Sequence, residues 1–279
     1  MKKWLTGLVL IFIAFFIGIP LWMLLSGTIM GGAELSENLA PVLEGGEGAA
    51  VWPVIAQYPT LQAYVELLLD TPQFFTVFWN SCRQVFPVVI GQIFLGAPAA
   101  WAFARFNFRG KKLHYTLYIV LMLMPFQVTM VSSYLVLNKR RLIDTVWAVI
   151  LPGAASTFPV FIMTRFFMAI PETIMEAAAV DGASPFQIFV RLGIPLGASG
   201  ILSAVVLGFL EYWNAMEAPQ AFLKNQALWP LSLYMANITA DNAGVSLIAS
   251  LITLMPPLLI FLAGQKYLEQ GIISSGMKD

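Results

Sequence analysis

Very few side chains of this chain could carry out chemistry. It has one cysteine, Cys82, and one histidine, His114, so it cannot by itself build a disulfide framework or a thiolate metal cluster. Cys82 lies in an apolar run, where we expect it to pack, and His114 lies at an expected helix start near the membrane interface. No Gly-x-x-x-x-Gly-Lys-Ser/Thr phosphate loop occurs, and paired catalytic carboxylates are hard to find because most acids lie in loops. We therefore expect that the chain is not an enzyme and binds no metal or cofactor.

The side chains of most chemical interest are polar groups inside long apolar segments, because such groups must face protein or water rather than lipid. Glu211 is the sharpest of them, with Arg83 as its expected counter-ion. An interhelical clamp or an interfacial anchor is the alternative role for Glu211. Pro125 and the pair Pro256-Pro257 free backbone groups, which suits bends that line a cavity. The candidates for a solute pathway are Gln127, Glu211, Tyr212, Trp213, Asn214 and Ser250, with Ser132, Ser133, Ser246 and Thr253 beside them.

The composition places these groups in a membrane. Hydrophobic residues make up 59% of the chain and charged residues only 11%, which is too little charge to cover the surface of a soluble domain of this length. The net charge is zero, so the chain lacks the excess of basic residues that nucleic-acid binding requires. Segments of about 20 apolar residues can cross the hydrocarbon layer. The first such segment exceeds a secretory signal in length, so we expect it to be retained. The predicted fold is an all-α integral membrane protein with six transmembrane helices, approximately over 4–30, 74–104, 113–137, 145–169, 195–217 and 245–268.

The positions of lysine and arginine predict the orientation, because cytoplasmic flanks carry the excess. Ten of these bases fall on the side of the N-terminus and four on the other, so we expect both termini in the cytoplasm. The cluster Lys139-Arg140-Arg141 is a local violation on the outer side, and the sequence assigns it no role. The acidic loop over residues 31–73 is expected outside and is too short to bury a core of its own. We therefore expect two parts: residues 1–73 with the first helix and the external loop, and residues 74–279 with the other five helices.

The segment over residues 170–195 interrupts the apolar spans with two short helices. Pro171-Glu172 is typical of a helix start and Gly182 of a helix end. Ser184-Pro185-Phe186-Gln187 indicates a capping box that opens a second helix, which we expect to end at Gly193-Ile194-Pro195. Helices this short are marginal in water and must dock on something, either a partner protein or lipid headgroups. The apolar side of the first helix consists of Ile174, Met175, Ala178 and Ala179.

The same residues resemble a known signature. Glu176-Ala177-Ala178, followed by Gly182 and then by Leu192-Gly193-Ile194-Pro195, resembles the EAA motif in the membrane subunits of binding-protein-dependent ABC importers. Leu192 and Ile194 stand where the family has Ile and Leu, which is a conservative exchange. The likeness covers roughly residues 74–279 and is similar to the carbohydrate-uptake branch, of the maltose-transporter second-permease type. Further matching stretches are Ile170-Pro171-Glu172, Asp181-Gly182-Ala183-Ser184, Tyr212-Trp213-Asn214, Pro256-Pro257-Leu258 and Gln270-Gly271-Ile272.

This resemblance implies the type I ABC importer permease fold, in which the EAA loop, here about 170–195, carries a cytoplasmic coupling helix. It implies a homologous second permease, two ATP-binding subunits that hold ATP and Mg²⁺ and dock on the EAA loops, and an external solute-binding protein that delivers a sugar. It assigns the coupling to the ATPase to Glu176, Ala177, Ala178, Asp181 and Gly182.

The prediction is then a multi-pass permease subunit of a bacterial inner membrane that forms half of the pathway of an ATP-driven importer for a sugar or oligosaccharide. A sugar ring could stack on Trp213, although aromatic residues near span ends often belong to interface belts. A secondary transporter and a non-transporting scaffold are the alternatives, but the charged mid-membrane residues and inverted repeat of a secondary transporter are not evident. The sequence leaves open which sugar is carried and which residues contact it.

Overall fold

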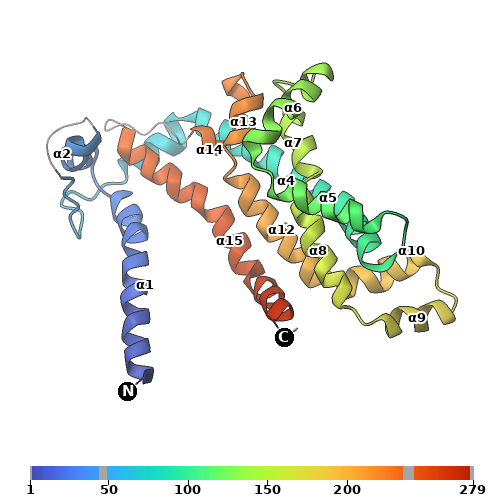
Figure 1. Ribbon diagram of the computed structural model, residues 1–279. Helices are drawn as coiled ribbons and strands as arrows, with labels where there is room; N and C mark the ends of the chain where they lie inside the picture. Colours follow the sequence, from blue (N-terminus) through green and yellow to red (C-terminus); the bar gives the residue numbers. More distant parts are fainter. Residues whose placement is uncertain (1, 44–48, 235–241, 277–279) are drawn as a thin grey trace. The chain divides into compact units, whose positions relative to one another are not determined.

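The computed structural model describes residues 2–43, 49–234 and 242–276 (Figure 1). Within these ranges all regular secondary structure is helical, and one isolated antiparallel bridge joins Met30 to Pro59. The predicted all-α fold class is confirmed. Contacts divide the chain into two compact units, Met1–Phe78 with Tyr234–Pro256, and Trp79–Leu233 with Pro257–Asp279. Tyr234–Pro256 therefore groups with the N-terminal part, whereas the expected division at residue 73 assigned this segment to the second part.

Among the described residues, four helical segments are each long and apolar enough to cross a membrane: Trp4–Gly27, Pro72–Arg105, Trp147–Ala169 and Ala243–Glu269. Two more segments meet this criterion only as bent pairs, Lys111–Leu123 with Phe126–Lys139 at 104° and Pro185–Leu196 with Ala198–Trp213 at 68°. The predicted number of six is reached when each bent pair counts as one span. The 104° bend falls at Pro125, where a bend was expected.

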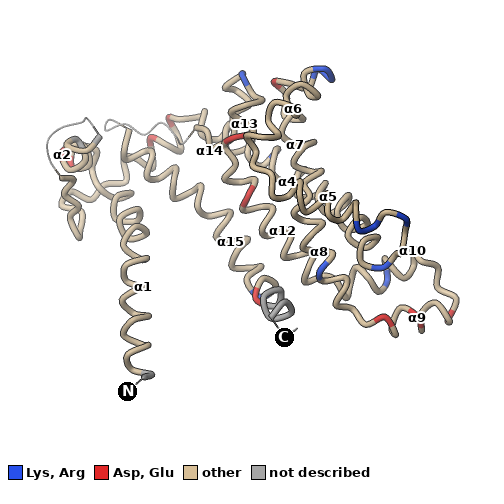
Figure 2. Tube along the Cα trace, viewed as in Figure 1, with Lys and Arg blue, Asp and Glu red and all other residues tan. Residues whose placement is uncertain are grey.

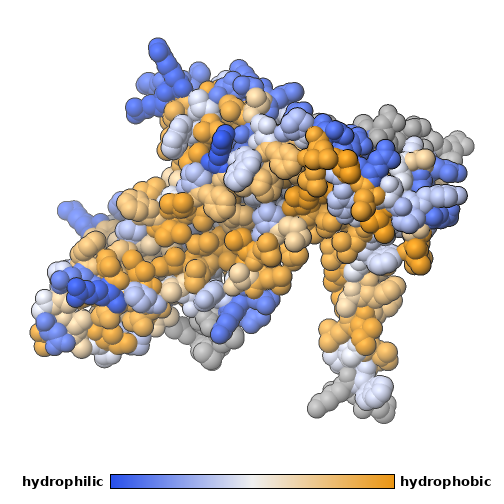
Figure 3. Space-filling model, turned by 180° about the vertical axis from the view of Figure 1, so that it is seen from behind, coloured by the Kyte–Doolittle hydropathy of each residue, from blue (hydrophilic) through white to orange (hydrophobic). Residues whose placement is uncertain are grey.

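The first unit begins with helix α1 (Lys2–Gly27). Its apolar side chains are exposed along its length, from Trp4 to Leu25, and Figure 3 shows its surface as mostly orange. A helix that is apolar all round needs lipid or another protein around it. The loop that follows α1 contains α2 (Gly32–Leu43), α3 (Gln62–Val65) and the π-helical turn η1 (Glu66–Asp70).

This loop packs against the ends of two long helices. Trp52 Nε1 donates to Ser26 Oγ at 3.0 Å, and the Glu34 carboxylate accepts hydrogen bonds from the N–H groups of Gln57 and Tyr58 at 2.9 and 3.1 Å. The loop thus buries apolar side chains together with helix ends, as its short length leads us to expect. The buried cluster that joins it to the start of α15 (Ala243–Gly276) consists of Met30, Leu35, Ala56 and Ala243.

The second unit packs the part of α4 (Pro72–Arg105) from Trp79 onward with α8 (Thr157–Ala169) and α12 (Ala198–Trp213). The rest of this unit includes α5 (Lys111–Leu123), α6 (Phe126–Lys139), α7 (Trp147–Ala154) and α13 (Glu217–Phe222). Asn80 and Gln84 of α4 donate hydrogen bonds to the backbone around η3 (Gln226–Leu228), which precedes α14 (Leu231–Tyr234). The last part of α15 joins through Ser203 Oγ, which donates to Tyr267 O at 3.1 Å.

The helix end expected at Gly193-Ile194-Pro195 is wrong. Helix α10 (Pro185–Ile188) continues through the π-helical turn η2 (Phe189–Gly193) into α11 (Ile194–Leu196), and the chain bends next to Gly197 instead. Gly193 serves packing here, because a Cβ at this position would lie 2.7 Å from the Trp101 ring. Pro195 lies directly after the π-helical turn η2, and such irregular turns accompany prolines inside helices. The span expected to end at residue 217 also ends earlier, at Trp213.

Candidate functional site

The polar segment after α8 forms an elbow, residues 170–197, at one end of the second unit (Figure 1). Its first helix, α9 (Glu172–Val180), ends in a Schellman motif. The Ala183 N–H donates to Ala178 O and the Gly182 N–H to Ala179 O, both at 3.0 Å, and Gly182 has a φ of 82°. Glycine adopts this left-handed conformation without steric cost. The helix end predicted at Gly182 is confirmed.

The second arm of the elbow opens with a reciprocal cap. The Gln187 N–H donates to Ser184 Oγ at 3.3 Å, and the Ser184 N–H donates to Gln187 Oε1 at 2.8 Å. The capping box predicted from the sequence is therefore confirmed. Because the two caps are separated by so few residues, α9 is held by a defined turn on its C-terminal side.

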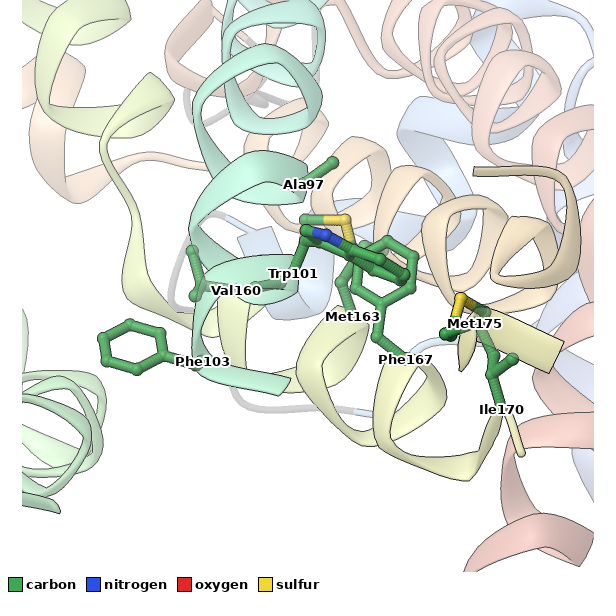
Figure 4. Packing of buried hydrophobic residues seen from close by; sticks show 10 residues of the cluster. Ala97, Trp101, Phe103, Val160, Met163, Phe167, Ile170 and Met175 are labelled. Carbon is green, nitrogen blue, oxygen red and sulfur yellow. The ribbon is translucent and has the colours of Figure 1, made fainter. Parts of the chain in front are cut away.

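Aromatic packing joins the elbow to α4 and α8 (Figure 4). Trp101 of α4 lies edge-on to Phe167 of α8, with ring centroids 5.3 Å apart, and Met175 is the buried residue of α9 in the same cluster. A Cβ at Gly197 would lie 2.3 Å from the Phe167 ring, so the start of α12 also packs closely here. Interiors packed this densely transmit displacement rather than absorb it. The elbow is therefore mechanically continuous with α4, α8 and α12.

Arg105, the last residue of α4, braces the start of the elbow. Its guanidinium donates to the carbonyl oxygens of Phe167 and Ile170 and lies 5.6 Å from the centre of the Trp101 ring. Glu172, in the first turn of α9, attracts it electrostatically. Arginine suits this place because its terminal nitrogen Nη2 carries two N–H donors, one for each of the two helix-end carbonyls. Sequence reasoning counted Arg105 only as a cytoplasmic charge, since the contact joins residues 62 positions apart.

Most of α9 is not covered by the rest of the unit. Val180 is 87% exposed and Ile174 39% exposed, which leaves apolar surface of α9 that no other described residue covers. A face of this kind on a short helix is what a groove of another protein would cover. The predicted coupling residues lie on this helix and its end, with Ala178 half-buried and Glu176, Ala177, Asp181 and Gly182 exposed. Their role in coupling stays a prediction.

A pocket of about 240 Å³ lies between α9 and the end of α4. Glu176 lines it, and Arg105 and Glu172 contribute the other charges. Glu176 therefore points toward the inner side of the elbow, whereas Ala177 is not among the lining residues. The remaining lining is apolar and includes Trp101, Phe106, Met175, Ala179, Pro185 and Ile188.

A second site is a cavity of about 410 Å³ formed by α5, α6, α7, α12 and the segments next to them. Met124 and Phe126, on either side of the bend at Pro125, are part of its wall. Hydroxyl groups and a carboxylate can exchange hydrogen bonds with a hydroxylated solute. The polar side chains in the lining are Thr129, Ser133, Ser156, Thr157, Glu211 and Tyr212.

The structure places Glu211 and Tyr212 in this cavity, as predicted for a pathway, but it corrects the partner of Glu211. Within residues 49–234, Glu211 forms no ion pair with Arg83. Glu211 is an exposed residue that lines the cavity, so water there can reach its side chain in place of a counter-ion. Tyr212 is half-buried, and its hydroxyl forms a hydrogen bond with Ser156.

The other predicted pathway residues differ in their surroundings. Gln127 Nε2 donates to Glu217 Oε1 at 2.8 Å and so links α6 to α13 near the cavity wall. Asn214 is exposed, and its Nδ2 donates to Leu210 O at 2.8 Å in its own helix. Ser250 belongs to the first unit and donates to Ser246 O at 2.8 Å within α15.

Trp213 does not fit the predicted contact with solute. Its side chain is only 3% exposed and stacks on Phe209, with centroids 5.4 Å apart and ring planes 15° from parallel. A buried, stacked ring cannot also stack on a sugar, so its role here is packing. The helical turn places Phe209 four residues before Trp213 on the same face, a spacing that the sequence also shows.

Two polar residues of this region were missed by sequence reasoning. Gln92 of α4 is buried, donates to Gly153 O at 3.0 Å, and lies where a Cβ at Gly208 would come within 2.4 Å of its Oε1. It clamps α4, α7 and α12 together beside the cavity. Gln92 is a polar side chain inside an apolar span, which is the same criterion that selected Glu211 from the sequence. Glu217 gave no clear signal, because it is the last residue of the expected span over 195–217, where an acid can lie in the membrane interface; in the structure α12 already ends at Trp213.

Comparisons with known proteins bear on both sites. A family model described as "Binding-protein-dependent transport system inner membrane component" matches residues 92–274, a range that contains the elbow and the lining of the cavity. A probable ABC transporter permease protein of Pyrococcus horikoshii is 32% identical over 200 residues, which are 70% of this chain and 72% of that protein. The arabinooligosaccharides transport system permease protein AraQ of Halalkalibacterium halodurans is 24% identical over 279 residues, with 99% and 96% covered. The sn-glycerol-3-phosphate transport system permease protein UgpE of Salmonella typhimurium is 24% identical over 253 residues, with 89% and 83% covered.

Solved structures share the fold. A chain of a bacterial ABC transporter involved in the import of the acidic polysaccharide alginate matches with a TM-score of 0.78 at 19% identity, and 95% of each chain is covered. A chain of a bacterial alginate ABC transporter, solved in complex with an alginate pentasaccharide-bound periplasmic protein, matches with a TM-score of 0.57 at 16% identity, with 75% of this chain and 82% of that chain covered.

Proposed function

This chain belongs to the family of binding-protein-dependent transport system inner membrane components, and we propose that it is one permease subunit of an ATP-driven importer for a sugar or oligosaccharide. The observation that carries the proposal is the elbow. It presents a short, capped, largely uncovered helix, and Arg105 and the Trp101 cluster fasten it to helices that lead to a polar cavity. A helix held in this way can receive a displacement from a partner and pass it to the cavity.

The partners follow from this assignment. We expect two ATP-binding subunits, which would hold ATP and Mg²⁺, with one of them seating α9 in a groove. A homologous second permease would supply the other half of the pathway, and an external solute-binding protein would deliver the solute. This arrangement places α9, the first helix of the elbow, and both termini in the cytoplasm, in agreement with the distribution of lysine and arginine.

The solute class is supported by the relatives and by the cavity. One relative is named for arabinooligosaccharides and another for sn-glycerol-3-phosphate, and both of these solutes carry hydroxyl groups. Hydroxyl and carboxylate groups line the cavity wall of this chain, and Glu211 can accept hydrogen bonds from a solute there. We assign the cavity to half of the translocation pathway, to be completed by the second permease.

The test measures how tightly solute uptake is coupled to ATP hydrolysis in a reconstituted importer. The double variant Glu176→Ala, Gly182→Ala removes a charge from the pocket side of α9 and strains its end, because alanine at a φ of 82° costs about 1 kcal/mol. A Cβ at Gly182 meets nothing within 4 Å, so the chain should still insert and fold. We expect uptake to fall at least about tenfold while ATP hydrolysis persists. The exposed acid Glu37, in the first unit, is the matched control as Glu37→Ala.

Two results would contradict the proposal. One is normal uptake by the double variant. The other is loss of wild-type uptake when the proton gradient is collapsed at constant ATP, which would indicate a secondary transporter instead. A scaffold without transport activity would give neither uptake nor a co-purifying ATPase.

A further inference from the structure

The turn after α6 carries positive charges that the proposed topology places on the outer side. Lys139, Arg140 and Arg141 follow one another there, and Lys224 projects from the segment after α13. All four side chains are exposed, and we call them the basic platform. Figure 2 shows these bases in blue at the tip of α6 and beside α13, at the end of the second unit away from α9. Outer flanks of membrane spans are normally poor in lysine and arginine, so the charge needs a reason.

The backbone at this turn is unusual for an arginine. The Leu142 N–H donates to Leu137 O and the Arg141 N–H to Asn138 O, both at 2.9 Å, which is the Schellman pattern seen also at the end of α9. The left-handed residue of this motif at α9 is Gly182, whereas here it is Arg141, with a φ of 56°. Glycine would adopt this conformation more easily. An arginine held in a strained conformation points to a use for its side chain.

A second contact fixes Lys224 beside the turn. Asp144 Oδ1 accepts hydrogen bonds from the N–H groups of Lys224 and Asn225 at 2.9 and 2.8 Å, and the Asp144 N–H donates to Phe222 O at 2.9 Å. Asp144 thereby joins two segments 80 positions apart and uses its carboxylate on backbone groups. The platform rests on a buried cluster of Leu137, Ala148 and Phe222. Its bases are therefore presented by a rigid support.

The charges of the platform are available to a partner. Within the part of the chain that the structure describes, none of the four bases forms an ion pair with a carboxylate. Arg140 and Ser133 line a cavity of about 540 Å³, and Ser133 also lines the cavity that contains Glu211. The platform thus borders the candidate pathway. A partner bound at Arg140 would therefore lie next to the cavity that we assign to the pathway.

We propose that the basic platform is an electrostatic docking site for an acidic surface of the solute-binding protein. The inference rests on the proposed function, since it requires this end of the unit to face outward. A cluster of like charges on a fixed support steers an oppositely charged protein and sets its orientation. Lipid headgroups are a less fitting occupant, because polybasic lipid contacts need no fixed backbone geometry and would not need a strained arginine beside a cavity.

The test uses the complete importer in nanodiscs of phosphatidylcholine. The solute-binding protein of the system is titrated in, and its half-saturating concentration is read from the stimulated rate of ATP hydrolysis. Arg141→Gly removes the charge and relieves the backbone, and Lys224→Gln removes a charge without touching the Asp144 contact, which uses the backbone N–H. Lys112→Gln, at the start of α5 and exposed, removes the same charge at the other end of the unit and serves as control.

We expect each platform variant to raise the half-saturating concentration about threefold and the pair about tenfold, as loss of exposed ion pairs would do. The wild-type value should rise with salt, and the double variant should respond less because fewer charges remain to be screened. The midpoint of thermal unfolding of Arg141→Gly should not fall, which separates lost docking from lost folding. Lys112→Gln should behave as wild type.

Several outcomes would overturn the inference. Unchanged half-saturation in the double variant would remove the docking role. An effect present only when phosphatidylglycerol is added to the nanodiscs would assign the platform to lipid headgroups, and a change only in the dependence on solute would assign it to solute. If the wild-type importer showed no stimulation by any binding protein, the proposed function would fail, whereas failure of the platform alone leaves wild-type stimulation intact.

Discussion

Arg105→Gln should uncouple the importer without preventing its assembly. The guanidinium donates to the carbonyl oxygens of Phe167 and Ile170 and lies over Trp101. A hydrogen bond from a charged donor contributes about 1.5–3 kcal/mol, and the cation–π contact adds about 0.5–1 kcal/mol. Because Arg105 is half-buried, water replaces part of this, and we expect a net loss of about 2–4 kcal/mol in the attachment of the elbow.

A loss of this size is enough to change where the elbow rests. Every 1.4 kcal/mol changes an equilibrium tenfold, so about 2–4 kcal/mol shifts the population of the braced position by a factor of about 30 to 1,000. A displacement of α9 would then shift the elbow relative to α8, and α8 itself would not move with it. The expected result is a fall of at least about tenfold in solute transported per ATP hydrolysed.

The assay measures uptake and ATP hydrolysis in the same preparation of proteoliposomes, so that the ratio does not depend on the yield of protein. Arg105→Lys keeps the charge but offers no planar fork, and we expect an intermediate ratio. Arg109→Gln removes an exposed base from the turn between α4 and α5 and should leave the ratio unchanged. A wild-type ratio in Arg105→Gln, with the ATPase still bound, would refute the bracing role of Arg105.

Two further predictions concern the cavity. A double-mutant cycle of Gln127→Ala and Glu217→Ala, read from thermal unfolding in nanodiscs, should give a coupling free energy of about 1 kcal/mol, because the two exposed side chains share one hydrogen bond of 2.8 Å. Additive effects of the two substitutions on stability would contradict that bond. Trp213→Ala should lower the free energy of unfolding by about 3 kcal/mol, because the buried packing on Phe209 is lost. The half-saturating solute concentration of the folded importer should stay the same. A large rise in that concentration at unchanged stability would return Trp213 to the solute pathway.

The elbow illustrates how far local patterns reach. The Schellman end at Gly182 and the capping box at Ser184 depend on residues within a few positions of each other, and both are present as predicted. The end expected at Gly193-Ile194-Pro195 was wrong because glycine has two uses, chain breaking and close packing, and only the position of Trp101 decides between them. Local sequence cannot report a ring that lies 92 positions earlier in the chain.

The cavity residues show the same limit. Polarity within apolar spans selected Glu211 and Tyr212 correctly as cavity-lining residues, since a polar group in a membrane must reach water or protein. It also selected Trp213, which is adjacent in sequence but points into packing against Phe209. The expected pairing of Glu211 with Arg83 assumed that a charge needs a counter-charge, whereas the cavity leaves Glu211 open to water.

The sequence by itself determined that this is a helical membrane protein, where its apolar segments lie, and that a capped elbow interrupts them, because hydropathy and helix caps act over a few residues. Only the tertiary structure decided which residues brace that elbow, which polar groups share a cavity, and that Asp144 holds the backbone of Lys224 next to the turn that carries the other three bases. Such contacts depend on how distant helices cross, and crossing is set by side-chain shape over the whole unit rather than by any short pattern.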